Sequence, residues 1–102
     1  MVGDSAGAKK RIAETFGDPR TVIIYRGVQT GMNQPQIVDA LKERGLPRAQ
    51  QQRVSDTLRE LEDAMFIRRT KTGFQRHEGW DEFGLERTVK KTLRDAKVAD
   101  IA

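Results

Sequence analysis

The sequence predicts a mainly α-helical fold with one small β-hairpin. In the segment RVSDTLRELEDAMFI, apolar residues recur at i, i+4, i+7 and i+11, the spacing of one helical stripe: Val54, Leu58, Leu61 and Met65. Directly after this segment, Thr72-Gly73 forms a turn signal with basic residues on both sides, which favours a short two-stranded hairpin. A second helical stripe closes the chain, with the spacing i, i+4, i+8 and i+11: Leu85, Val89, Leu93 and Ala96.

Residues 1–17 are predicted to be an N-terminal extension that is partly helical. Ala8, Ile12 and Phe16 lie at helical spacing, while Ser5 could cap such a helix and Gly17 could end it. We expect the extension to dock its apolar residues either onto the main body or onto a partner chain.

Two helices with clear start signals follow. Asp18-Pro19 predicts an N-cap and a proline in the first helical position, with Gly31 at the end of the segment, although its β-branched residues would also suit a strand. Asn33 predicts the N-cap of a helix over residues 34–44, which Gly45 ends. The residues expected to face inward from these two segments are Val22, Ile23, Tyr25, Ile37, Val38 and Leu41, with Ile24 inward in only some placements of the segment.

The remaining elements are a long helix over residues 48–65, a hairpin over residues 67–80 and a last helix over residues 81–97. Trp80 is expected to anchor the end of the hairpin to the core. Phe74 could either fold back onto the long helix or stay exposed at the hairpin tip.

The long helix has an uneven distribution of polar residues. With its apolar stripe inward, the outward positions are Arg48, Ala49, Gln52, Asp56, Arg59 and Asp63, and Arg53 lies at the flank. Its first half is basic and amide-bearing, whereas its last turns are acidic, which opposes the helix dipole. This order favours a helix that enters the major groove of DNA by its N-terminus, with Asp56 orienting Arg53 or Arg59. The alternative is a solvated face with pairs such as Arg59 and Asp63.

The composition narrows the function classes. The net charge is +4, from 19 basic and 15 acidic residues, so an anionic partner is favoured mainly by where the charges lie. The chain has no cysteine and one histidine, and we expect no metal site, no cofactor and no obvious small-molecule ligand. It contains no set of residues typical of an enzyme, no run of membrane-span length and no signal peptide, so we expect a cytoplasmic protein that is not an enzyme.

The end of the long helix and the hairpin carry a resemblance to a known family. Val54-Ser55, Leu58-Arg59-Glu60-Leu61-Glu62 and Ala64, followed by Phe66-Ile67-Arg68-Arg69, resemble the recognition helix and wing of winged helix-turn-helix regulators of the MarR, ArsR and PadR kind. The resemblance covers roughly residues 19–80. It departs from the family at Gly45-Leu46-Pro47-Arg48 and at the Gln50-Gln51-Gln52 run.

This resemblance implies a winged helix-turn-helix domain over residues 18–80 that binds double-stranded DNA as a sequence-selective transcriptional regulator. The residues expected to contact DNA are Arg48, Gln52, Arg53, Asp56, Arg59, Arg68, Arg69, Lys71 and Arg76. Residues 81–102 are expected to form a homodimer through Leu85, Val89, Leu93 and Ala96, a stripe that a small body would not hide by itself. The alternatives are a winged-helix adaptor that binds another protein, and a monomer whose last helix folds back over its first.

Overall fold

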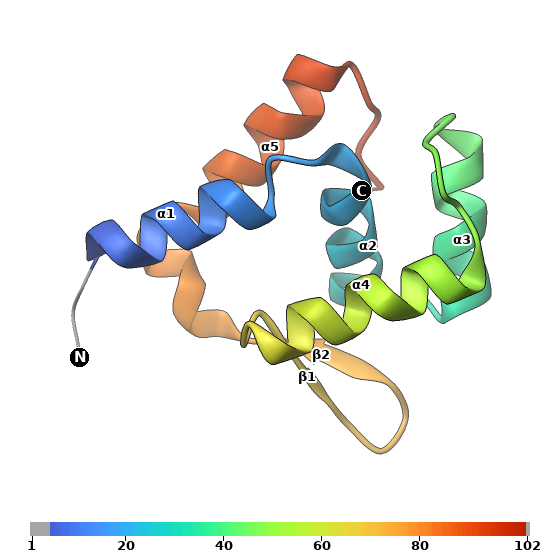
Figure 1. Ribbon diagram of the computed structural model, residues 1–102, viewed down its shortest axis with the longest axis horizontal. Helices are drawn as coiled ribbons and strands as arrows, with labels where there is room; N and C mark the ends of the chain where they lie inside the picture. Colours follow the sequence, from blue (N-terminus) through green and yellow to red (C-terminus); the bar gives the residue numbers. More distant parts are fainter. Residues whose placement is uncertain (1–4, 102) are drawn as a thin grey trace.

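The computed structural model describes residues 5–101, and the prediction of a mainly helical chain with a small antiparallel hairpin is confirmed (Figure 1). The elements are α1 (Ser5–Thr15), α2 (Pro19–Gln29), α3 (Gln34–Glu43), α4 (Gln51–Asp63), β1 (Ile67–Arg69), β2 (Phe74–Arg76), the 3-10 helix η1 (Glu78–Phe83) and α5 (Leu85–Ala96).

Local capping explains where α2 and α3 begin. The Asp18 side chain accepts a hydrogen bond from the backbone N–H of Arg20, and Pro19 occupies the first position of α2. Asn33 and Gln36 form a reciprocal capping box at the start of α3. Both predicted starts are therefore confirmed.

The segment that could have been a strand is the central helix, α2. Val22, Ile23, Ile24 and Tyr25 are all at most 1% exposed. The helix contacts α3, α4, α5 and β2, so it is covered on nearly every side. Packing around the whole helix thus outweighs the preference of its β-branched residues for strands.

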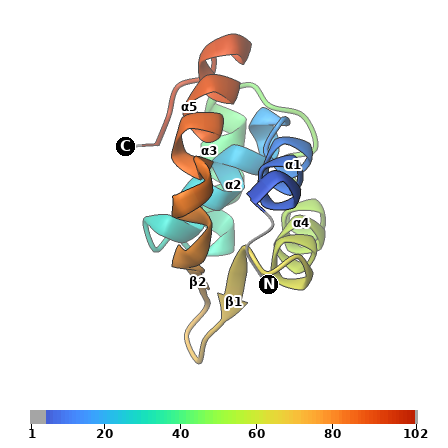
Figure 2. The same ribbon diagram turned by 90° about the vertical axis from the view of Figure 1, so that its left-hand side faces the viewer.

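The N-terminal helix packs onto the main body of the same chain. Ile12 and Phe16 are buried, and the Phe16 ring meets the rings of Tyr25 and Phe66 edge-on, each at 4.9 Å between centroids. Viewed from the α1 and α5 side, these two helices lie side by side in front of α2 (Figure 2). The Thr92 hydroxyl joins them by donating to the carbonyl of Phe16 at 2.6 Å.

The predicted boundaries of the long helix are wrong at both ends. The helix α4 begins at Gln51, because Arg48 adopts a left-handed backbone with φ 57° and lies in the preceding loop. Met65 is also left-handed, with φ 70°, and its side chain is 59% exposed instead of completing the core stripe. The turn at Met65 ends the helix and directs Phe66, which is fully buried, into the core instead.

The hairpin is shorter than predicted. Its register pairs Ile67 with Arg76 and Arg69 with Phe74, and the remaining residues up to Trp80 enter η1. The indole N–H of Trp80 donates to the carbonyl of Met65 at 2.9 Å, and its ring lies 4.2 Å from that of Phe66, as expected for an anchor. The last helix begins at Leu85 instead of residue 81, because Gly84 takes a left-handed conformation between η1 and α5.

The apolar stripe of α5 is covered within one chain. Leu85, Val89 and Leu93 are at most 4% exposed and belong to the hydrophobic core, while Ala96 is exposed. The premise that the body cannot hide this stripe was therefore wrong. Homodimerisation itself stays a prediction, now without that argument.

Candidate nucleic-acid interface

The residues expected to contact DNA lie in three consecutive segments. Arg48 is in the loop before α4, four residues are on α4 and four are in the hairpin. Those exposed to solvent are Arg48, Gln52, Arg53, Arg59, Arg68, Arg69 and Lys71, whereas Asp56 and Arg76 are half-buried.

Of the positions predicted to face outward from the long helix, Gln52, Arg59 and Asp63 are exposed, whereas Asp56 is half-buried. The outward prediction for Ala49 is wrong, because Ala49 precedes α4 and packs against the core. The contacts within the outward face also differ from those expected. Asp56 accepts a hydrogen bond from the amide of Gln52 at 2.9 Å, so the expected contact with Arg53 or Arg59 is wrong. The ion pairs formed within residues 5–101 also do not include Arg59 with Asp63. At the flank, the backbone carbonyl of Arg53 accepts from Arg20 of α2 at 3.2 Å, which fixes the first turn of α4.

The hairpin is attached to α4 through Arg69. Its guanidinium forms an ion pair with Glu62 at 3.3 Å and lies 4.8 Å from the centre of the Phe74 ring. Phe74 is half-buried and packs against the core, which settles its orientation. The last turn of α4 and the hairpin therefore form one continuous surface.

Two further hairpin cations point outward. Arg68 donates to the side-chain oxygen of Gln75, its cross-strand neighbour, at 2.7 Å. Lys71 lies in the turn and is exposed, and it forms no ion pair with any residue from 5 to 101. Both cations are exposed and neither is in an ion pair within residues 5–101, so both are available to an anionic partner.

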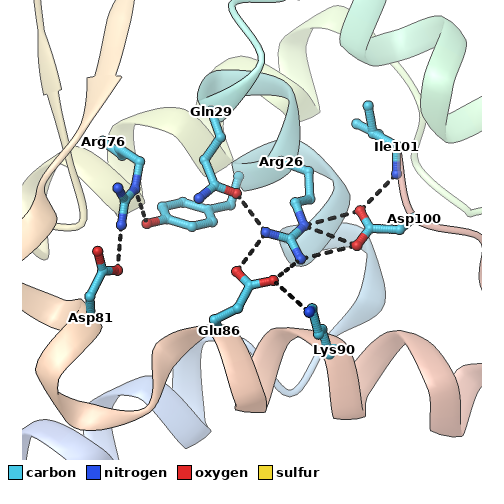
Figure 3. Close-up of polar contacts among 9 residues, drawn as sticks. Arg26, Gln29, Arg76, Asp81, Glu86, Lys90, Asp100 and Ile101 are labelled. Atoms are coloured by element: carbon cyan, nitrogen blue, oxygen red, sulfur yellow. Dashed lines mark hydrogen bonds and ion pairs between the residues drawn. The ribbon is translucent and has the colours of Figure 1, made fainter.

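Arg76 points the other way (Figure 3). It lies opposite Ile67, and directly paired residues share a face of the sheet, so its side chain is on the inner side with buried Ile67. There it forms an ion pair with Asp81 and donates to the Tyr25 hydroxyl at 3.5 Å. These partners raise the pKa of Arg76, and burial raises the pKa of Tyr25. Arg76 thus joins the hairpin to α2 and η1.

Sequence reasoning missed two arginines that bind the C-terminal strap, defined as residues 98–101. Arg26 of α2 contacts Glu86 at 2.5 Å and Asp100 at 3.0 Å (Figure 3). Arg44 donates to the backbone carbonyls of Ala99 and Asp100 at 2.6 and 3.0 Å. The strap is therefore held across α2 and α3. A sequence signal for this was absent, because arginines on helices are mostly solvated.

The part of the chain that the structure describes contains neither a candidate metal-binding group nor a candidate membrane-spanning helix. Within residues 5–101, no group of three or more histidine, aspartate or glutamate side chains could hold a metal ion. None of the helices in this range is both long and apolar enough to span a membrane. Comparison of the chain with protein-family models, with curated proteins and with solved structures finds no match.

Proposed function

We propose that this protein binds double-stranded DNA as a sequence-selective transcriptional regulator, using a winged helix-turn-helix. In this proposal α3 and α4 are the helix-turn-helix and the β1–β2 hairpin is the wing. The observation that carries it is the continuous surface in which exposed hairpin cations adjoin the polar face of α4 through the Arg69–Glu62 pair.

The distribution of charge favours different roles for the hairpin and for α4. Residues 67–76 hold three exposed basic residues and no acidic one, since the fourth cation, Arg76, points inward, whereas α4 holds two basic and four acidic residues. The hairpin is therefore suited to phosphate contacts, and the net charge of α4 is unsuited to them. Base contacts would come from the N-terminal half of α4 through Gln52 and Arg53, with Arg59 beside them.

A salt titration of DNA binding tests the phosphate contacts. Lys71→Gln should weaken binding to all sequences alike and reduce the slope of log affinity against log salt by about 0.9, because one phosphate contact is lost. Lys97→Gln is the matched control, since Lys97 is an exposed lysine at the end of α5, outside the helix-turn-helix and the hairpin. An affinity for duplex DNA that does not fall with salt would contradict the proposal.

A substitution on α4 tests the base contacts. Gln52→Ala should cost about 1–3 kcal/mol at the preferred site and relax the base preference at one position. A selection of DNA sequences from a random pool measures both effects. An unchanged selected sequence would show that Gln52 does not read a base.

A protein-interaction adaptor is the second candidate, and the acidic surplus of α4 favours it. Asp63→Lys should then abolish capture of the partner, and nuclease treatment should leave the capture unchanged. Loss of the captured partner after nuclease treatment would instead indicate that nucleic acid mediates the contact.

We also propose that the protein is a homodimer and lies in the cytoplasm. A dimer would place two α4 helices about one DNA turn apart, roughly 34 Å, and favour a palindromic site. Sedimentation equilibrium tests it, and a mass of one chain with and without DNA would exclude it.

A further inference from the structure

The last helix carries a second concentration of positive charge that the proposed function does not use. Residues 85–97 contain five basic and two acidic residues, a net +3 in a chain whose total is +4. Four of the cations follow the helical spacing i, i+3, i+4 and i+7, so they share one face of α5: Arg87, Lys90, Lys91 and Arg94. The apolar stripe of the same helix is buried, so this face points to solvent.

The cations on this face are accessible. The side chains of Lys90, Lys91 and Arg94 are 68%, 66% and 74% exposed. Lys91 contacts Asp95 at 2.9 Å, and Lys90 lies 3.8 Å from Glu86, whose carboxylate is bound more closely by Arg26. Pairs of this kind on an exposed helix contribute little to its stability. A polyanion can therefore replace them at little cost.

The residue types on this face of α5 favour duplex DNA over a membrane surface or a protein as the anionic partner. A helix that inserts into a membrane surface needs an apolar face toward the lipid, and that of α5 is buried in the core. Protein interfaces are centred on aromatic or apolar anchors, and the outward face of α5 has none. Duplex DNA instead offers a regular row of phosphates, with one charge per about 1.7 Å of its axis. The neighbouring helix α1 adds two more exposed cations, Lys9 and Lys10.

The position of α5 determines which DNA it can reach. The hairpin projects at the bottom of Figure 1, whereas Figure 2 shows α5 on the left and α4 on the right, with α2 between them and in contact with both. The molecule measures 37 × 35 Å along its two longer axes. Because the buried stripe of α5 faces the core, its outward face points away from α4, so a duplex seated on α4 does not lie along this face. We propose that Arg87, Lys90, Lys91 and Arg94 bind the backbone of a second duplex, so that one molecule bridges two DNA segments.

A capture assay tests this inference, which rests on the proposed function. A duplex is fixed to beads, the protein is added, and retention of the protein and of a second, fluorescent duplex is measured separately. The native protein should capture the fluorescent duplex. The variant with Arg87→Gln, Lys90→Gln, Lys91→Gln and Arg94→Gln should stay on the beads through its hairpin but lose this capture.

The matched control keeps every charge and exchanges only the side chains, with Arg87→Lys, Lys90→Arg, Lys91→Arg and Arg94→Lys. It should bridge like the native protein, and circular dichroism should show both variants as helical as the native chain, because all three residue types favour helices. Protein that is retained without capturing the second duplex would overturn the bridging inference alone. Capture that survives the glutamine substitutions would also overturn it, and two hairpins of a dimer would then explain the bridging. Failure of the native protein to bind any duplex would overturn the proposed function itself.

Discussion

Replacing Arg26 with methionine should strongly destabilise the protein. Arg26 is 9% exposed and donates to three side chains, those of Glu86, Asp100 and Gln29. Methionine has a similar length but cannot donate, so the substitution leaves the acceptors without their shared partner. It also removes the hydrogen bonds from Arg26 of α2 to Asp100 of the C-terminal strap.

The expected loss is about 2–4 kcal/mol. The Asp100 side chain is 27% exposed, and a hydrogen-bonded charge pair at this depth contributes about 1.5–3 kcal/mol. The Glu86 side chain is 51% exposed, so solvent screening limits its pair to about 0.5–1 kcal/mol. For a domain of this size the sum corresponds to a fall in Tm of roughly 10–20 °C.

The pH dependence of the free energy of unfolding provides a second test of this prediction. The hydrogen bond from Arg26 lowers the pKa of Glu86 below its ordinary value of 4.5. Glu86 therefore stabilises the fold fully above about pH 4.5, and this contribution disappears as the pH falls through its lower pKa in the folded protein. The difference in stability between the native protein and Arg26→Met should thus shrink below pH 4.5.

Urea denaturation followed by circular dichroism measures both effects. Arg94→Met is the control, because its side chain is 74% exposed and the same change there should stay within about 0.5 kcal/mol. A loss below about 1 kcal/mol for Arg26→Met, or a difference that does not shrink in acid, would refute the reasoning.

Three substitutions and one control test the packing and the turns. Phe66→Ala removes a fully buried ring and should cost about 3–5 kcal/mol in urea denaturation, and a cost below about 1 would be inconsistent with its place in the core. Gly45→Ala should cost about 1–2 kcal/mol, because Gly45 has φ +69°, which a residue with a side chain rarely adopts. The control Gly79→Ala should cost less than about 0.5 kcal/mol, because there is open space around Gly79. Equal thermal midpoints for the two variants would contradict the argument. Gly27→Ala would place a Cβ 2.6 Å from Cγ1 of Ile37 and should cost about 1–3 kcal/mol, so an unchanged Tm would show that α3 can move away freely.

The helix boundaries that could be predicted are those with a local chemical signal. Asp18 and Asn33 form side-chain hydrogen bonds to the first turns of α2 and α3, and both residue types favour this position wherever they occur. At the start of α4, Gln50 forms no such bond, and the left-handed turn at Arg48 is rare for a residue with a side chain. That boundary depends on tertiary packing, so the sequence pattern placed it too early.

In the candidate site, too, only the side-chain directions that follow from a local pattern could be predicted. The outward positions of Gln52 and Arg59 follow from helix geometry and agree with their exposure. The inward positions of Arg26 and Arg76 do not follow from any local pattern. Arg26 meets a carboxylate 74 residues away, and the direction of Arg76 depends on the register of the hairpin. Long side chains of this kind take their direction from partners that only the folded chain provides.

The packing of Trp80 makes its fluorescence sensitive to the docking of α1. It is the single tryptophan of the chain, and the Arg11 guanidinium of α1 lies 4.9 Å from its ring. Arg11 also donates to the carbonyl of Ala64 at 2.7 Å, so α1 closes over the junction where α4 leads into the hairpin. If α1 separates while α2–α4 stay folded, the indole gains water and its emission moves to longer wavelength before helicity is lost. Tryptophan fluorescence thus follows the docking of α1 separately from global unfolding.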